Sequence, residues 1–163
     1  MKSTLPDVHE FLSQRTLAIA GVSRSGKKMG NAILKSLKGN GYTMFPVHPS
    51  AEAIEGEKCY PSLQALPEKV GGLVICLPSV QTEIVLHQAL AAGITRIWLQ
   101  QGAQSYAALR FCEQEGMKVV HGQCILMFSE PVESIHRVHR WVWRLIGKYP
   151  SLIPAGDRFM DPA

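Results

Sequence analysis

The stretch that decides the fold is TLAIAGVSRSGKKMG, which occupies residues 16–30. Its first five residues form a short, mostly apolar run, as expected for a strand buried in a parallel sheet. Three glycines follow at positions 21, 26 and 30, and a helical pattern begins directly after the last of them. A strand, a glycine-rich turn and a helix in this order are typical of a βα unit whose helix start can hold an anion.

Outside this unit, short apolar runs alternate with helical segments along the chain. We expect parallel strands at residues 16–20, 42–47, 73–77, 96–99 and 118–120. Pro46 is expected to break the second strand. We expect helices at about residues 31–38, 80–92 and 106–115, each closed by a glycine. This alternation predicts an α/β fold, Rossmann-like, with a five-stranded parallel sheet and helices on both faces.

A last helical segment departs from this rhythm. Apolar residues recur at helical spacing over Val132–Lys148, with basic residues and two tryptophans at most other positions. We expect one Rossmann-like domain over residues 1–128, followed over residues 129–163 by an amphipathic C-terminal helix and a tail. Three roles remain open for the helix: packing on the domain, forming a homodimer or partner-protein surface, and lying on a membrane surface.

Composition excludes several classes of protein. Of the 163 residues 46% are hydrophobic and 18% are charged, so a packed core is expected and intrinsic disorder is excluded. The net charge of +4 is too small to indicate nucleic-acid binding, and no uncharged run is long enough to span a membrane. The four cysteines lack a C-x-x-C pair, and the first 15 residues lack the apolar run of a secretory signal. We therefore expect a reduced, cytoplasmic protein without a metal site.

Basic residues gather around the glycine-rich turn. Residues 1–48 contain seven lysines and arginines against two acidic residues, whereas residues 49–128 contain five against seven. Arg24, Lys27 and Lys28 lie in the turn itself, where they add charge to the free N–H groups of the following helix. The turn is therefore predicted to bind a phosphate-containing ligand. The alternative is a tight turn whose basic residues are incidental.

Two common nucleotide-binding patterns are incomplete here. The turn reads G-x-x-x-x-G-K from Gly21, but Lys28 stands where a triphosphate-binding loop needs Ser or Thr for magnesium. The G-x-G-x-x-G dinucleotide pattern is absent, and His48 follows the second strand where an NAD site needs an acidic residue. Both observations disfavour ATP hydrolysis and NAD binding. An NAD(P)-dependent oxidoreductase, with Arg24 and Lys28 accepting a 2′-phosphate, stays as the alternative function.

Four segments in order carry a resemblance to a known family. They are GVSR from residue 21, FPVHP from residue 45, the stretch 56–67 that contains CYPSL, and IWLQQG from residue 97. Together they resemble, over about residues 8–124, the small bacterial and archaeal CoA-binding proteins of the succinyl-CoA-synthetase α-subunit type. The resemblance implies a Rossmann-like domain that binds coenzyme A or an acyl-CoA at the carboxyl edge of its sheet. It implies a carrier, a sensor or a subunit without a catalytic domain of its own.

The resemblance also implies which residues bind the cofactor. The turn residues implied to meet the phosphate groups are Gly21, Val22, Ser23, Arg24, Ser25, Lys27 and Lys28. The residues implied to lie near the adenosine are Val47, His48 and Pro49, of which His48 departs from the Val-Asn-Pro common in the family. The residues implied to line the path of the pantetheine arm are Leu77 and Pro78. No catalytic residue and no metal ligand is assigned.

Two further residues are expected near the same edge of the sheet. His121, at the end of the fifth predicted strand, is the best placed of the six histidines for catalysis, but we expect none from it. Cys124 is expected to be a small buried hydrophobic residue, and the alternative is a mixed disulfide with the thiol of CoA.

Overall fold

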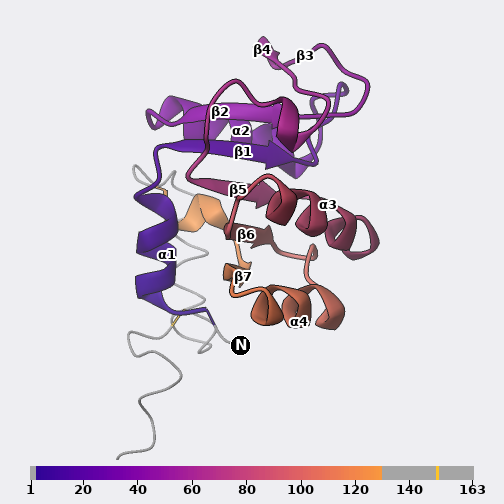
Figure 1. Cartoon of the computed structure of the whole chain (residues 1–163). Coiled ribbons are helices and arrows are strands. Elements are labelled where there is room, and N and C mark those ends of the chain that lie inside the picture. The colour runs from indigo at the N-terminus through magenta and orange to yellow at the C-terminus, as the bar shows by residue number, and fades with distance from the viewer. Residues whose placement is uncertain (1–2, 130–149, 151–163) are drawn as a thin grey trace, which may run out of the picture.

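A five-stranded parallel sheet lies between two layers of helices (Figure 1). The computed structural model describes residues 3–129 and Pro150. The strands of the sheet are β1 (Thr16–Ala20), β2 (Thr43–Val47), β5 (Gly72–Ile75), β6 (Arg96–Gln100) and β7 (Lys118–Gln123). The helices are α1 (Leu5–Leu12), α2 (Met29–Gly39), α3 (Ser79–Ala91) and α4 (Tyr106–Gln114). The predicted Rossmann-like α/β fold is confirmed.

The order of the strands reverses direction at β1. Neighbouring strands follow the order β2-β1-β5-β6-β7, so the chain leaves β1 on one side to form β2 and returns to form β5 on the other side. In open α/β sheets such a reversal opens a crevice at the carboxyl ends of the two strands, and ligands bind there. The turn after β1 and the residues after β5 meet at this point, where Cys76 N donates to Ala20 O at 2.8 Å.

Alternate side chains along a strand point to opposite faces of the sheet, and each face packs against its own pair of helices. In β1, Leu17 and Ile19 belong to the core formed with α1 and α2, whereas Ala18 and Ala20 belong to the core formed with α3 and α4. All four side chains are buried. Because both faces are covered, the strands need apolar residues at consecutive positions, and this explains the continuous runs in the sequence.

The sequence pattern does not predict α1, the first helix. Thr4 and Asp7 form a capping box at its start, since Thr4 N donates to Asp7 Oδ2 at 2.8 Å and Asp7 N donates to Thr4 Oγ1 at 3.4 Å. The ring of Phe11 packs edge-on against Trp98 with centroids 5.4 Å apart. The helix has only eight residues, so its stability depends on these contacts rather than on its own length.

Other elements differ from expectation in detail. Pro46 lies inside β2 rather than breaking it, because β2 is an edge strand of the sheet and Pro46 takes part on its outer side as an acceptor, from Tyr60 N at 2.9 Å. β7 continues to Gln123, so His121 lies within the strand and not at its end. The short elements that complete the fold are the antiparallel pair β3 (Ala53–Ile54) and β4 (Glu57–Lys58), and the 3-10 turns η1 (Leu63–Ala65) and η2 (Ile125–Met127).

Several expectations about the end of the chain fall outside the described residues. The helix predicted over residues 132–148 and nearly all of the predicted segment 129–163 belong to this group. Within residues 3–129, no helix is long and apolar enough to cross a membrane. The same residues contain no cluster of three or more histidine, cysteine, aspartate or glutamate side chains that could hold a metal ion.

One carboxylate connects α1 to the amino ends of two strands. Glu10 Oε1 lies 3.2 Å from Arg96 Nε at the start of β6 and 2.7 Å from Lys118 Nζ at the start of β7. The hydrogen bond from Lys118 lowers the pKa of Glu10 below its usual 4.5, and Arg96 adds to this effect. The charged form of Glu10 is therefore favoured in the folded chain.

We expect Glu10→Gln to reduce stability at neutral pH by no more than about 1 kcal/mol, because the side chains involved are partly exposed. A carboxyl whose pKa is lower in the folded state stabilises the fold above its unfolded pKa, and loses this contribution as the pH falls below it. The difference between the variant and the natural chain should therefore shrink as the pH falls below 4.5. Urea unfolding at several pH values measures this difference.

Glu113→Gln, which loses only a 4.0 Å contact with Arg110, is the control and should leave stability unchanged. A difference that is constant with pH would contradict this account.

Candidate functional site

The glycine-rich turn after β1 packs between the end of β5 and the start of α2. Gly21 has a φ of +99°, and a Cβ placed on it would lie 2.4 Å from the carbonyl oxygen of Cys76. Gly30, in the first turn of α2, would carry its Cβ 2.6 Å from the carbonyl oxygen of Gly21. Neither position has room for a side chain. The backbone of the turn is therefore held closely on both sides.

Asn31 of α2 holds the middle of the turn through its side chain. The Asn31 side chain is fully buried, its Oδ1 accepts from Ser23 N at 3.0 Å, and its Nδ2 donates to Ser23 O at 2.8 Å. Ser23 is connected to the next residues as well, because its Oγ lies 2.9 Å from Ser25 Oγ and accepts from Ser25 N. These bonds hold Ser23 and Ser25 in place within the turn.

A cavity of about 460 Å³ opens beside this turn. One wall is the turn itself, and the other consists of α2 and the β3–β4 hairpin; the lining residues are Ser23, Arg24, Ser25, Gly26, Lys27, Lys35, Ala53, Ile54 and Glu55. Arg24 and Lys27 are exposed and, among the described residues, form no ion pair. Lys28 is exposed too but does not line the cavity. The cavity therefore offers positive charge that nothing in residues 3–129 neutralises.

Lys35 and Glu55 also line the cavity, and the sequence analysis assigned neither to the site. Lys35 Nζ lies 2.7 Å from Glu55 Oε2, and Asn31 Nδ2 donates to Glu55 Oε1 at 2.9 Å. The hydrogen bonds from Lys35 and Asn31 lower the pKa of Glu55, so this carboxyl is charged. The sequence carried little signal for this hairpin: Gly56 suits a two-residue turn, but glutamate is not among the residues that usually precede that glycine.

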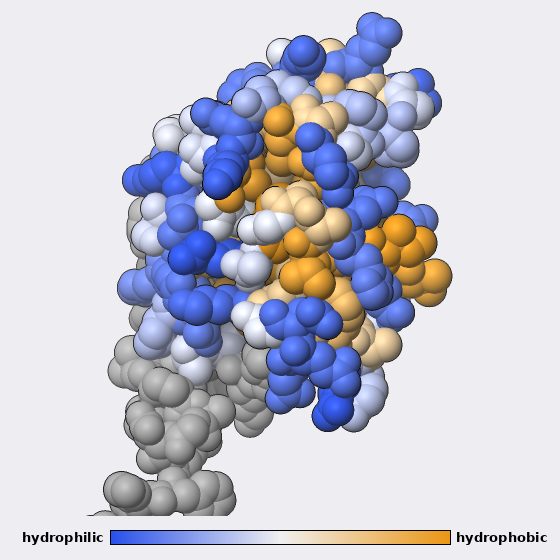
Figure 2. Space-filling model, viewed as in Figure 1, coloured by the Kyte–Doolittle hydropathy of each residue, from blue (hydrophilic) through white to orange (hydrophobic). Residues whose placement is uncertain are grey.

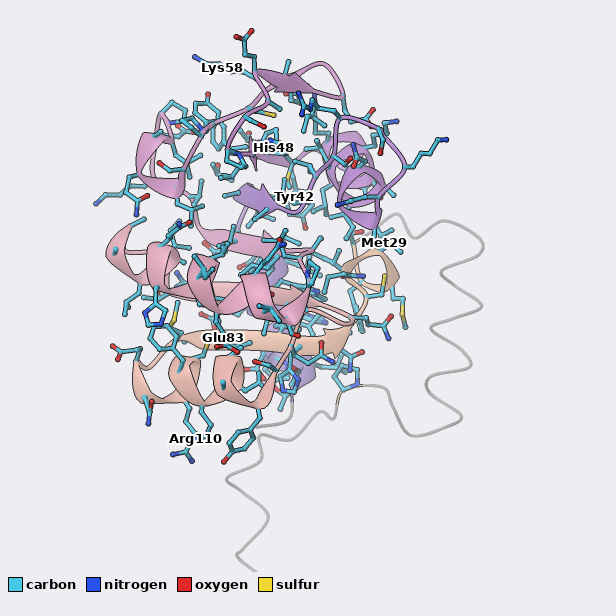
Figure 3. All side chains as sticks on the ribbon, turned by 90° about the vertical axis from the view of Figure 1, so that its right-hand side faces the viewer. Met29, Tyr42, His48, Lys58, Glu83 and Arg110 are labelled. Carbon is cyan, nitrogen blue, oxygen red and sulfur yellow. The ribbon has the colours of Figure 1, made fainter. Side chains whose placement is uncertain are left out.

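His48, which departs from the family pattern, holds the loop that follows β2. Its Nδ1 accepts hydrogen bonds from Ser50 N at 3.2 Å and from Ala51 N at 3.1 Å. The oxygen of an asparagine side chain makes the same kind of contact with the residues that follow it. Histidine can therefore replace asparagine here as an acceptor. In Figure 3, His48 lies near the hairpin that carries Lys58, away from Glu83 on α3 and Arg110 on α4.

The remaining predicted residues lie at the same edge of the sheet but outside the cavity. Val47 ends β2 and Pro49 follows it, whereas Leu77 and Pro78 connect β5 to α3. The starts of α3 and α4 expose apolar side chains: Val80 and Ile84, in the first two turns of α3, are 80% and 60% exposed, and Tyr106, the first residue of α4, is 80% exposed. Figure 2 shows hydrophobic side chains at the right edge of the molecule, where α3 lies in Figure 1.

Cys76, Cys124 and His121 lie at or near the ends of β5 and β7. Burial, and to a smaller extent the neighbouring Cys124 thiol, raises the pKa of Cys76 to about 12. Cys124 is only 7% exposed and belongs to the apolar core, as predicted for a packing residue. The main-chain N–H and C=O of His121 both bond to Ser3 Oγ, which connects β7 to the start of the chain.

A larger cavity, of about 730 Å³, lies at the opposite, amino edge of the sheet. Its lining is formed by η1 and the segments that precede β5 and β6, with Leu63, Leu66 and Ile94 among the apolar members and Lys69 as the cation. Figure 2 shows hydrophobic side chains gathered down the middle of the side of the molecule that carries α3 and α4 in Figure 1. Ligands of parallel α/β sheets bind at the carboxyl edge, and the uncompensated cations lie there too. The smaller cavity is therefore the candidate site.

Comparisons with known proteins agree on one family. A family model described as "CoA binding domain" matches residues 15–130 of the chain. The chain is 33% identical over 93 residues to an acetate–CoA ligase (ADP-forming) II of Archaeoglobus fulgidus, which covers 56% of this chain and 14% of the ligase. The chain thus spans only a small part of the length of that curated relative.

Solved structures share the fold. A conserved hypothetical protein from Pyrococcus furiosus is 39% identical, with a TM-score of 0.65, and the match covers 68% of this chain and 96% of that protein. A dinucleotide-forming acetyl-coenzyme A synthetase 1 from Ca. Korarchaeum cryptofilum, solved in complex with phosphate and ADP, is 26% identical with a TM-score of 0.59. That match covers 66% of this chain and 25% of the synthetase.

The close packing of the turn gives a test with a matched control. We expect Gly30→Ala to destabilise the chain by about 1–3 kcal/mol, because the new methyl group meets the backbone of Gly21. Gly39→Ala, at the other end of the same helix, has nothing within 4 Å of the added Cβ and should be neutral or stabilising by up to about 1 kcal/mol. Denaturant unfolding measures both changes. Equal effects of the two substitutions would show that helix propensity, not the close approach, decides the result.

Proposed function

The chain belongs to the CoA binding domain family, and from this we propose that it binds coenzyme A or an acyl-CoA at the carboxyl edge of its sheet. Its role would be that of a carrier, a sensor or a subunit. Catalysis is not part of the proposal. Within the described residues of the cavity, the side chains offered are cations, hydroxyls and a carboxylate already paired with Lys35, which suit phosphate binding better than proton transfer.

The observation that carries this proposal is the uncompensated charge beside the glycine-rich turn. Three cations and one carboxylate line the cavity: Arg24, Lys27, Lys35 and Glu55. CoA carries a diphosphate and a separate phosphate on the 3′ oxygen of its ribose, so it presents anionic groups at two places. A charge-assisted hydrogen bond contributes about 1.5–3 kcal/mol, and a few of them suffice for micromolar binding.

The proposed contacts follow the order of the groups along CoA. We propose that Ser23, Arg24 and Ser25 bind the diphosphate, with the backbone of Gly21 and Val22 approaching closely and Lys27 and Lys28 within reach of either phosphate site. The loop Val47-His48-Pro49 would border the adenosine. Leu77 and Pro78, with the exposed Val80 beyond them, would border the pantetheine arm. Support for this order comes from the position of all three segments at one edge of the sheet.

An NAD(P)-dependent oxidoreductase has less support. NAD sites of this architecture use an acidic side chain directly after the second strand for the ribose hydroxyls. His48 occupies that position, and its Nδ1 is engaged by the backbone of its own loop. A panel of ligands separates the two proposals.

We expect CoA and acetyl-CoA, each at about 100 times its dissociation constant, to stabilise the chain by about 2.7 kcal/mol and to raise its melting temperature by several degrees. NAD⁺, NADPH and ATP at the same concentration should produce much smaller shifts. A thermal-shift series measures this. A shift with NADPH and none with CoA would overturn the proposal and favour the oxidoreductase.

We expect Arg24→Ala to weaken CoA binding by roughly 10- to 100-fold, as removal of a charge-assisted hydrogen bond requires. Isothermal titration measures the change. Arg110→Ala is the matched control, because it also removes one exposed guanidinium but lies on α4, far from the cavity (Figure 3). If both variants bind CoA equally well, Arg24 does not contact the ligand and the proposed phosphate site is wrong.

A further inference from the structure

The cavity has a feature that a plain phosphate site does not need, namely a carboxylate in its wall. Glu55 lies on the hairpin opposite the glycine-rich turn, and its side chain is 15% exposed. Its Oε1 is 3.2 Å from the place where a Cβ on Gly26 would stand, so the carboxylate lies directly against the turn. A negative charge here works against the binding of a phosphate unless it has a role of its own.

The backbone that carries Glu55 is unfavourable for this residue. Glu55 has a φ of +54° and is followed by Gly56 at +77°, in the two-residue turn between β3 and β4. Turns of this kind prefer Asn, Asp or Gly at the first position, since other side chains are strained there. Such strain is tolerated where contacts over-determine it, and it points to a function. The contacts in this case are those with Asn31 and Lys35.

Lys35 and Glu55 together present a cation and an anion side by side. Lys35 Nζ lies 2.7 Å from Glu55 Oε2, and both side chains line the cavity. Lys35 is 61% exposed, so its other N–H donors remain open to a ligand. The group that fits such a pair is a phosphate next to a hydroxyl: the phosphate meets the ammonium, and the hydroxyl donates to the carboxylate. In NAD sites of Rossmann folds, a carboxylate accepts hydrogen bonds from ribose hydroxyls in the same way.

We propose that Lys35 and Glu55 read the phosphorylated ribose of the ligand, with Lys35 binding the 3′-phosphate and Glu55 accepting a hydrogen bond from the 2′-hydroxyl. This inference rests on the proposed binding of CoA and adds a selection rule to it. A ribose with its phosphate on the 2′ oxygen would place that phosphate against the Glu55 carboxylate. The pair therefore selects 3′-phosphorylated over 2′-phosphorylated nucleotides, and Arg24 and Lys27 remain for the diphosphate.

Two isomeric nucleotides test whether the site prefers a 3′-phosphate to a 2′-phosphate. Adenosine 3′,5′-bisphosphate and adenosine 2′,5′-bisphosphate have the same atoms and nearly the same charge, and differ in which ribose oxygen carries a phosphate. We expect the full chain to bind the 3′,5′ isomer at least about tenfold more tightly by isothermal titration, as one well-placed charged contact requires. Glu55→Gln keeps an acceptor oxygen but removes the charge. It should strengthen binding of the 2′,5′ isomer and reduce the preference by about fivefold or more.

The hairpin supplies the matched control. Glu57 pairs with Lys38 of the same helix α2 but does not line the cavity, so Glu57→Gln makes the same chemical change in the same hairpin and should leave the preference unchanged. A second variant, Lys35→Met, should weaken the 3′,5′ isomer about tenfold while leaving adenosine 5′-monophosphate unaffected. It tests the pair even if Glu55→Gln fails to fold.

The outcomes separate this inference from the proposed function. Equal binding of the two isomers, binding of neither, or a preference that Glu55→Gln and Lys35→Met both leave unchanged would overturn the inference. If CoA itself still binds in the same titration, the proposed function stands and only the roles of Lys35 and Glu55 are wrong. If CoA does not bind, the proposed function fails first.

Discussion

The close approach of three backbone segments is the constraint on which the site depends. Gly21 lies against the carbonyl of Cys76 at the end of β5, and Gly30 of α2 lies against the carbonyl of Gly21. This packing brings the turn to the point where the winding of the sheet reverses, and the cavity lies between the turn, α2 and the β3–β4 hairpin. The Asn31 side chain then holds the main chain of Ser23 through two hydrogen bonds. The backbone of the turn is thus held both by close packing and by hydrogen bonds.

Charge is distributed over this frame in two different ways. Arg24 and Lys27 extend from the turn and form no ion pair among the described residues. Lys35, in the second turn of α2, is paired with Glu55, with 2.7 Å between Nζ and Oε2. The first arrangement attracts any anion, since it is limited only by distance and screening. The Lys35–Glu55 pair favours an anion that has a hydrogen-bond donor, such as a hydroxyl, beside it. A ligand with phosphates at both ends of a nucleotide can use both arrangements at once.

Sequence reasoning succeeded where structure is set by neighbours along the chain, and failed where distant segments meet. The residues of β1 and its turn form one continuous stretch, so the strand, the glycines and the cations could all be predicted together. Glu55 and Lys35 stand 20 positions apart, and only the folding of the hairpin onto α2 brings them together. The eight-residue α1 was missed although Thr4 and Asp7 form a local capping box, because so short a helix also depends on its contact with Trp98, far along the chain. Pro46 was misjudged because the pattern alone does not show that β2 is an edge strand.

The two glycines that cannot carry a side chain also decide how such a site can diverge. Substitution at Gly21 or Gly30 alters the frame itself, so those positions offer no route to a new ligand that keeps the fold intact. The side chains that extend from this backbone are not restricted in this way. Arg24 and Lys27 are exposed, and Lys35 is largely exposed and pairs only through its ammonium group, with Glu55. Duplicated copies of this domain can therefore come to bind a different ligand through the replacement of a few surface residues. The scaffold that presents those residues need not change.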